Sequence, residues 1–269
     1  MTSLAVEKIA ELNQVLDAIG RVAVAVSGGV DSLTLACAAH LRLGADAVMF
    51  HAVSPAVPPE ASERTRRHAA RFGWKLEVID AGEFADPEYL RNPANRCFYC
   101  KTNLYAAIAR GSQGTIVSGT NFDDLADFRP GLEAAKKYHV RHPYVEVGIG
   151  KSLVREIAAT FGLGEAADLP ASPCLSSRIE TGIRVTTDTL ALVHAVERLV
   201  SRSLEVATVR CRIRSNGLIV ELDGPAYERV MAEDNPGLRS EIERLGTDHG
   251  YAGTAQFALY RMGSAFLRT

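Results

Sequence analysis

The chain has 269 residues and carries 30 Lys and Arg against 32 Asp and Glu, a balance that disfavours a broad nucleic-acid-binding surface. No apolar run approaches the roughly 20 residues that cross a bilayer, and the N-terminal segment lacks the pattern of a secretory signal. We therefore expect a cytoplasmic protein without a membrane partner, long enough for one or two domains.

Helical and strand patterns alternate along the first two-thirds of the chain. The predicted helices cover residues 3–19, 31–43, 59–72, 101–109 and 152–161. The predicted strands cover residues 21–26, 47–53, 76–80 and 115–118, with a short extended piece at 144–147. This order indicates an α/β fold in which crossover helices join the strands of a parallel sheet.

The pattern changes after residues 168–182, a Pro-, Ser- and Gly-rich stretch that we interpret as the loop between two units. Beyond it, the predicted elements are a helix at 187–201, a hairpin at 207–215 and 218–222, a helix at 226–245 broken at Pro236, and a strand at 255–260. We therefore predict a first domain at 1–180 and a smaller α+β C-terminal domain at 181–269.

The stretch VAVAVSGGVDS, residues 22–32, joins an apolar strand to a helix through two adjacent glycines. Such a turn presents backbone N–H groups beside the positive end of a helix, which is an arrangement that binds anions. The spacings of the Walker A loop and of the Rossmann turn are both missing from it. The competing explanation is an ordinary glycine turn capped by Asp or Ser.

The five cysteines are an odd number and too sparse for a disulfide scaffold. Cys97 and Cys100 have the C-x-x-C spacing, which suits zinc, a redox pair or an iron–sulfur cluster. Cys174 lies in a loop, ASPCLSSR, unlike the buried helical setting of an inert thiol. Cys37 and Cys211 fall within an apolar helix and a strand, which favours structural roles.

The motif SGGVDS after a first buried strand resembles the pyrophosphate loop (PP-loop) of the ATP pyrophosphatase superfamily, which is adenine nucleotide alpha hydrolase-like in fold. Its members transfer AMP to a substrate and release pyrophosphate. The phosphate contacts expected from this resemblance are Ser27, Gly28, Gly29 and Ser32. Asp31 is expected to hold Mg²⁺ or to orient the loop, and we predict it to be catalytic.

The motif SGGVDS occurs in this chain together with the stretches NPANRCFYCK, SGTNFDDLADFRPGL and ASPCLSSR. On the basis of these four stretches, the whole chain resembles the LarE family of ATP-dependent sulfur transferases. The resemblance implies that ATP and Mg²⁺ take part in adenylating a carboxylate of pyridinium-3,5-biscarboxylic acid mononucleotide. The carboxylate would then become a thiocarboxylate, as a step in making the nickel-pincer nucleotide of lactate racemase. The resemblance also implies a sulfide source and a homo-oligomer.

Two sulfur sources occur in that family. In one type, the cysteine that matches Cys174 gives up its own sulfur to the acyl-adenylate and becomes dehydroalanine. In the other type, cysteines that match Cys97, Cys100 and Cys174 hold a 4Fe-4S cluster whose fourth iron carries an additional sulfide. Because this chain has all three cysteines, the resemblance favours the cluster type, with Cys174 as a catalytic residue.

Charged residues near the expected nucleotide site are further candidates. Gly119 ends the strand at 115–118, and Asp123 and Asp124 open the next turn, where open parallel sheets bind ligands. These carboxylates either hold Mg²⁺ on ATP or cap a helix. Arg129 and Arg178 are predicted clamps for a substrate carboxylate or phosphate, with solvated surface positions as the alternative.

The stretch TVRCRIRSNGLIVELD spaces Arg210, Arg212 and Arg214 by two, which places them on one face of a strand. The family carries an R-x-R strand and a glutamate that help bind the substrate phosphate, and Arg212, Arg214 and Glu221 resemble them. The alternative is a solvated face paired with acidic residues.

Two other functions are compatible with these motifs. A tRNA thiolase of the same superfamily would also use three cysteines, but the balanced charge of the chain counts against an RNA surface. A non-catalytic nucleotide-binding or iron–sulfur protein would keep the same motifs for structural reasons.

Overall fold

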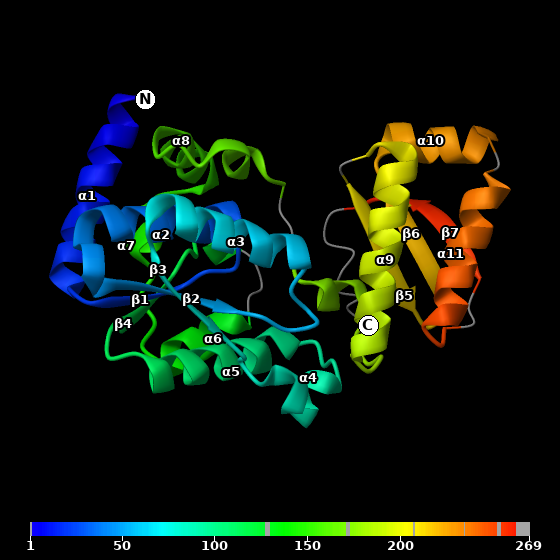
Figure 1. Ribbon diagram of the computed structural model, residues 1–269, viewed down its shortest axis with the longest axis horizontal. Helices are drawn as coiled ribbons and strands as arrows, with labels where there is room; N and C mark the ends of the chain where they lie inside the picture. Colours follow the sequence, from blue (N-terminus) through cyan, green and yellow to red (C-terminus); the bar gives the residue numbers. More distant parts are fainter. Residues whose placement is uncertain are drawn as a thin grey trace. The chain divides into compact units, whose positions relative to one another are not determined.

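The computed structural model describes residues 2–126, 130–170, 173–206, 208–233, 235–251 and 254–261 (Figure 1). The chain divides into two compact units, and each is made of two segments. Unit 1 contains Met1–Asp86 and Asn95–Ser172, and unit 2 contains Pro87–Ala94 and Pro173–Thr269. The division thus differs from the predicted boundary after residue 180.

Unit 1 is built on a four-stranded parallel sheet in the order β3-β2-β1-β4. Its strands are β1 (Val22–Ala25), β2 (Ala47–Ala52), β3 (Lys75–Ile79) and β4 (Thr115–Ser118). The central β1 pairs on both sides, with Val22 opposite Ala47 and Thr115. The predicted α/β class, with a parallel sheet like that of a PP-loop domain, is confirmed.

Helices cover both faces of this sheet (Figure 1). The helices of unit 1 are α1 (Ser3–Ile19), α2 (Val30–Leu43), α3 (Pro59–Phe72), α5 (Arg96–Gly111), α6 (Gly131–Lys137), α7 (Pro143–Glu146) and α8 (Lys151–Thr160). Short 3-10 helices are η1 (Gly44–Asp46), η2 (Glu83–Ala85), η3 (Phe122–Ala126) and η4 (Gly164–Asp168).

The alternation along β1 explains the two layers. Val22 and Val24 belong to the core shared with α1, α2 and α8, whereas Ala23 and Ala25 belong to the core shared with α5 and α6. Successive side chains of a strand point to opposite faces, so one short apolar strand anchors helices on both sides. The end of β1 therefore lies at a fixed position, and the Gly-rich loop begins there.

Two predictions about unit 1 were wrong. Helix α5 begins at Arg96 instead of residue 101, so Cys97 and Cys100 lie in its first two turns and not in a loop. The aromatic ring of Phe98 packs against the core between α5 and the sheet, and this burial extends the helix. The piece at 144–147 is helical, because Pro143 provides the fixed φ angle that favours a first helical turn.

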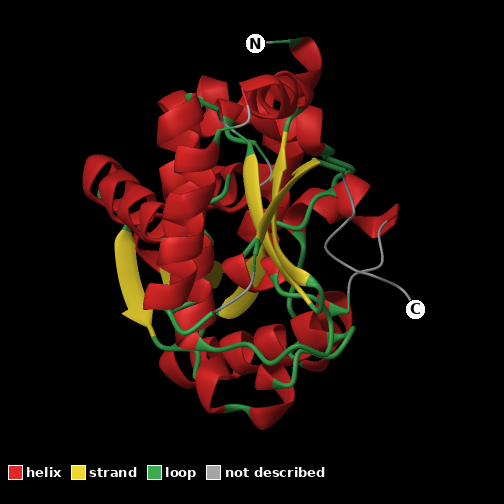
Figure 2. Ribbon diagram, turned by 90° about the vertical axis from the view of Figure 1, so that its right-hand side faces the viewer, coloured by secondary structure: helices red, strands yellow, loops and turns green. Residues whose placement is uncertain are grey.

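Unit 2 contains a three-stranded sheet in the order β5-β6-β7, whose strands Figure 2 shows in yellow. The hairpin β5 (Val209–Arg214) and β6 (Gly217–Leu222) is antiparallel, and β7 (Ala255–Leu259) runs parallel to β6. Its helices are α4 (Pro87–Leu90), α9 (Thr187–Leu204), α10 (Gly224–Glu233) and α11 (Pro236–Asp248), together with the 3-10 helix η5 (Leu175–Arg178). The predicted break at Pro236 is confirmed.

The segment Pro87–Ala94 belongs to unit 2 because its polar groups bond there. The side-chain amide nitrogen of the buried Asn92 lies 2.8–3.3 Å from the carbonyl oxygens of Ile179, Glu180 and Ile183. The Tyr89 hydroxyl lies 2.6 Å from the Ser176 hydroxyl. These bonds connect the short segment Pro87–Ala94 to the start of the segment Pro173–Thr269. No local sequence pattern predicts a contact between residues so far apart in the chain.

No helix in the described ranges combines the length and the apolar character needed to cross a membrane.

Candidate functional site

The Gly-rich loop between β1 and α2 lies against helix α3. Gly28 has a φ angle of +81°, and a Cβ atom there would lie 2.5 Å from the carbonyl oxygen of Ala61. Only glycine fits both the dihedral angle and this close approach. The Nε of Arg64 donates a hydrogen bond to the Gly28 carbonyl oxygen at 2.7 Å, so α3 also holds the loop through a side chain.

The two serines of the loop bond to each other and to the backbone. The Ser27 N–H donates to the Ser32 Oγ at 3.1 Å, and that hydroxyl donates to the Gly29 carbonyl oxygen at 3.0 Å. The two hydroxyl oxygens are 3.1 Å apart. Among the described residues, no side chain caps α2 at Gly29. Backbone N–H groups in the first turn of a helix commonly bind an anion, and those of α2 are placed to do so.

Asp31 is oriented by groups from two other segments. Its Oδ1 accepts a hydrogen bond from the Asn121 side-chain amide at 2.9 Å, and its carbonyl oxygen accepts one from the Tyr144 hydroxyl at 3.2 Å. Burial is the main reason that the pKa of Tyr144 lies well above its ordinary value, so its hydroxyl remains a donor.

Gly119 contributes to the site by close packing. A Cβ atom at this position would lie 2.8 Å from the carbonyl carbon of Asp31. The end of β4 can therefore approach the first turn of α2 only with glycine at 119. The predicted binding residue Gly119 thus determines where Asp31 lies.

The carboxylates of Asp123 and Asp124 accept hydrogen bonds from backbone N–H groups. Asp123 Oδ2 accepts from the N–H of Lys151 at 2.7 Å, at the start of α8, and Asp124 Oδ2 accepts from the N–H of Asn121 at 3.1 Å. Asp123 thus binds a free N–H at the start of the distant helix α8, whose N-cap residue is Gly150, instead of capping a helix that begins at its own position. Asn121 connects Asp31 to this turn. Its side-chain amide nitrogen donates to Asp31, and its Oδ1 accepts a hydrogen bond from the Asp123 N–H at 3.0 Å.

Cys97 and Cys100 lie one helical turn apart on α5, and both are half-buried. Residues three apart share a face of a helix, so the two thiols lie on the same side of it. Both belong to unit 1. The second segment of that unit begins at Asn95, two residues before Cys97.

Cys174 belongs to unit 2, where it is half-buried at the start of η5. Its loop is held by Arg178, whose side chain is only 2% exposed. One terminal nitrogen of this guanidinium lies 2.7 Å from the Pro173 carbonyl oxygen and 3.3 Å from that of Cys174. The guanidinium also binds both carboxylate oxygens of Glu197, at 2.8 and 3.2 Å.

The alternative of a solvated position is therefore wrong for Arg178. Its predicted role as a clamp for a substrate carboxylate or phosphate stays a prediction, because the carboxylate that its guanidinium binds in this structure is that of Glu197 in the same unit. Such a fork-to-carboxylate pair is rigid, and it fixes the backbone on both sides of the Cys174 thiol. Arg129, the other predicted clamp, lies outside the described residues.

Arg210 and Arg212 are buried and Arg214 is half-buried, so the alternative of a solvated face is wrong here too. The pairing with an acidic residue is confirmed for Arg212 and Arg214. Arg212 Nε lies 2.9 Å from Glu221 Oε2, and its Nη1 donates to the Ser177 carbonyl oxygen at 3.0 Å. Arg214 lies 3.8 Å from Glu221 Oε1. Burial lowers the pKa of Arg210 and of Arg212.

Cys37 and Cys211 are buried, in agreement with the structural roles predicted for them. Burial raises the pKa of Cys37 to about 11 and that of Cys211 well above its ordinary value. Neither thiol is a nucleophile at neutral pH, because the thiolate is the reactive form.

Several residues that organise the site were missing from the sequence-based candidates. Asn121 stands in the quoted motif SGTNFDD, and its position between a strand end and two acids could have marked it. Tyr144 and Arg64 reach the Gly-rich loop of unit 1 from distant positions in the chain. Glu197 likewise reaches Arg178 within unit 2, and no local spacing distinguishes these three residues.

No model of a known protein family matches the chain. An uncharacterized protein of Synechocystis sp. is 39% identical over 235 residues, covering 86% of this chain and 87% of that protein. A pyridinium-3,5-bisthiocarboxylic acid mononucleotide synthase of Lactiplantibacillus plantarum is 30% identical over 227 residues, covering 82% of this chain and 81% of that enzyme. An uncharacterized protein of Methanocaldococcus jannaschii is 24% identical over 235 residues, covering 86% of each.

Proposed function

Because the chain belongs to the LarE family of sulfur transferases, we propose that it makes a thiocarboxylate on a pyridinium mononucleotide at the expense of ATP. A carboxylate of pyridinium-3,5-biscarboxylic acid mononucleotide attacks the α-phosphate of ATP, and pyrophosphate leaves. Sulfur then displaces AMP from the acyl-adenylate, as a step toward the nickel-pincer nucleotide. The observation that carries this proposal is the loop Ser27–Ser32, closed by its serines at the N-terminus of α2.

The residues of the loop have separate tasks in this reaction. Gly28 and Gly29 let the backbone approach phosphate oxygens, and the N-terminus of α2 offsets their negative charge. Asp31, held by Asn121, meets the cation that accompanies the phosphates. Mg²⁺ is commonly bound by one or two carboxylates together with phosphate oxygens, so a single oriented Asp31 fits it. When bound, Mg²⁺ stabilises the charge that develops on the departing pyrophosphate.

The sulfur source that we propose is a 4Fe-4S cluster held by Cys97, Cys100 and Cys174. Thiols are the donors that such clusters require, and three of them leave one iron without a protein ligand. All three are half-buried, in contrast to the inert Cys37 and Cys211. When bound, the cluster would supply a replaceable sulfide, and Arg178 would keep the Cys174 backbone in place.

Pyrophosphate release tests the reaction class. The purified chain is incubated with ATP, Mg²⁺ and the biscarboxylic mononucleotide, and pyrophosphate and AMP are measured by phosphorus NMR. We expect pyrophosphate only when the mononucleotide is present, and we expect Asp31→Asn to abolish it. Release of ADP and phosphate instead, or equal pyrophosphate release from Asp31→Asn, would contradict the proposal. A binding protein without activity would release neither product.

A further inference from the structure

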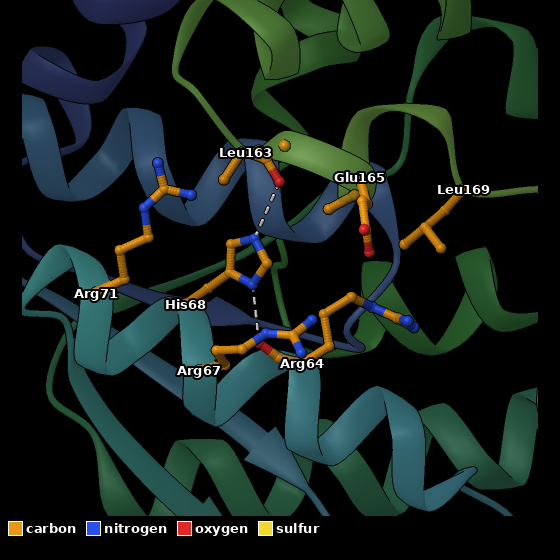
Figure 3. A pocket seen from close by; sticks show the side chains of 9 residues that line it. Arg64, Arg67, His68, Arg71, Leu163, Glu165 and Leu169 are labelled. Carbon is orange, nitrogen blue, oxygen red and sulfur yellow. Dashed lines mark hydrogen bonds between the residues drawn. The ribbon is translucent and has the colours of Figure 1, made fainter.

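A pocket of about 340 Å³ opens in unit 1 between α3 and the segment that contains η4 (Figure 3). Helix α3 contributes Arg64, Arg67, His68 and Arg71, whose spacing places them on one face of the helix. The facing segment contributes apolar side chains and one carboxylate, that of Glu165. The volume lies at the small end of the range for ligand pockets.

His68 joins the two walls of this pocket. Its side chain is buried, and the residue is only 6% exposed. Nδ1 lies 2.8 Å from the Arg64 carbonyl oxygen, and Nε2 lies 3.3 Å from that of Leu163, as the dashed lines of Figure 3 mark. The imidazole also stacks on Trp74, with ring centroids 6.3 Å apart. These contacts hold the His68 ring in one orientation at the back of the pocket.

The pocket holds three guanidinium groups against one carboxylate. Arg67 makes no hydrogen bond or ion pair with any described residue, and Arg71 lies over the ring of Phe72 at 5.0 Å. Burial, followed by the charge of Arg67, lowers the pKa of Arg64. The like charges of Arg64 and Arg67 repel each other, and an anion placed between them would relieve that repulsion.

We propose that this pocket binds a phosphate or pyrophosphate group as a second anion site beside the Gly-rich loop. Guanidinium groups match the oxygen geometry of phosphates, and Arg67 and Arg71 are exposed at its mouth. Arg64 connects the pocket to the loop, because its Nε binds the Gly28 carbonyl oxygen. The site goes beyond the proposed function, which uses the loop alone for the phosphates of ATP, and it does not depend on the sulfur chemistry.

Calorimetric titration of the full chain with inorganic pyrophosphate tests the site. Arg67→Gln and Arg71→Gln are each expected to weaken one binding event about tenfold or more, as the loss of a charge-assisted hydrogen bond predicts. Arg66→Gln is the matched control, because Arg66 is an exposed arginine of the same helix that does not line the pocket. It should bind as the wild type does. Circular dichroism verifies that each variant is folded.

The loop and the pocket are distinguished by the number of sites. If both bind pyrophosphate, the wild type takes two per chain and Arg67→Gln retains the loop site. If the loop does not bind it, the wild type takes one, and Arg67→Gln binds that one about tenfold or more weakly. Parallel titrations with AMP show whether a phosphate ester enters the pocket in place of the inorganic anion. Equal binding by the wild type, Arg66→Gln and Arg67→Gln would overturn the proposal.

Discussion

The side-chain amide of Asn121 donates a hydrogen bond to Oδ1 of Asp31 at 2.9 Å, across 90 residues of sequence. The carbonyl oxygen of the same amide accepts the N–H of Asp123 at 3.0 Å. A single residue, three positions beyond the end of β4, thus determines the direction of the Asp31 side chain at the start of α2. Such positioning matters in phosphoryl and adenylyl transfer, where correct geometry supplies much of the rate.

Replacing Asn121 by Ala should therefore impair the reaction more than it impairs folding. Loss of one positioning hydrogen bond is expected to lower kcat for pyrophosphate release by about 10- to 100-fold. Asn121→Asp should be worse, since a second carboxylate would repel Asp31. Steady-state kinetics checks both, with Asn13→Ala on α1 as the control. Unchanged kcat in Asn121→Ala would show that Asp31 needs no such support.

Gly28→Ala should disable the loop, whereas Gly82→Ala should be tolerated better. Both glycines have nearly the same dihedral angle, with φ of +81° and +82°, but a Cβ at 82 meets nothing within 4 Å. The shared strain costs about 1–2 kcal/mol in each variant. Only Gly28→Ala adds the clash with the Ala61 carbonyl oxygen. Chemical unfolding and ATP titration measure the difference, and equal losses in the two variants would contradict the close approach.

Much of the fold follows from local sequence patterns. The Val and Ala alternation of β1 predicts a strand with two covered faces, and the Gly-Gly turn predicts where ligand-binding N–H groups lie. The helical conformation of the segment that holds Cys97 and Cys100 could not be predicted in this way. Its Asn and Pro neighbours are typical of a loop, and the burial of Phe98 against the sheet outweighs that preference.

The organisation of the site depends even more on distant contacts. Arg178 matches a guanidinium clamp in sequence, but only the structure reveals Glu197 as its partner. The membership of residues 87–94 in unit 2 follows from the hydrogen bonds of Asn92, which reach residues almost 90 positions away. Pairings of this kind depend on how the chain folds back on itself, so the spacing of residues in a single sequence does not contain them.

Arg178→Met should destabilise unit 2 strongly. Removing one partner of a buried ion pair leaves the other charge without compensation, at a cost of about 3–5 kcal/mol. The Arg21–Asp46 pair provides the control, because both of its side chains are more than half exposed at a separation of 3.1 Å. Arg21→Met should cost less than about 1 kcal/mol. Urea unfolding measures the free energy of unfolding of both variants. Equal decreases in the two variants would show that the buried Arg178–Glu197 pair stabilises the protein no more than the exposed Arg21–Asp46 pair.

The five thiols should divide into two reactivity classes in cluster-free protein. Burial holds the pKa of Cys37 at about 11, so its thiolate is scarce at neutral pH and forms only as pH rises toward that value. Cys211, with its pKa also raised, should behave alike. Brief alkylation at pH 8 followed by peptide mass mapping should therefore modify Cys97, Cys100 and Cys174 first. Early modification of Cys37 or Cys211 would contradict their burial.

The iron content of the chain and its mass after turnover identify the source of the sulfur. Purified without oxygen, the chain should contain about four irons with matching labile sulfide, as one cubane cluster requires. Cys97→Ser, Cys100→Ser and Cys174→Ser should each lose the iron and its visible absorption, whereas Cys37→Ala, which removes a buried thiol outside the proposed ligand set, should keep both. With sulfide supplied, the intact chain should thiolate more than one mononucleotide per chain while its own mass stays constant, because the transferred sulfur is replaced from solution. An anaerobic chain without iron that turns over once and loses the mass of one hydrogen sulfide at Cys174 would instead identify that cysteine as the donor. That outcome would leave the adenylation step intact, because pyrophosphate release depends on Asp31 and its loop and not on the thiols.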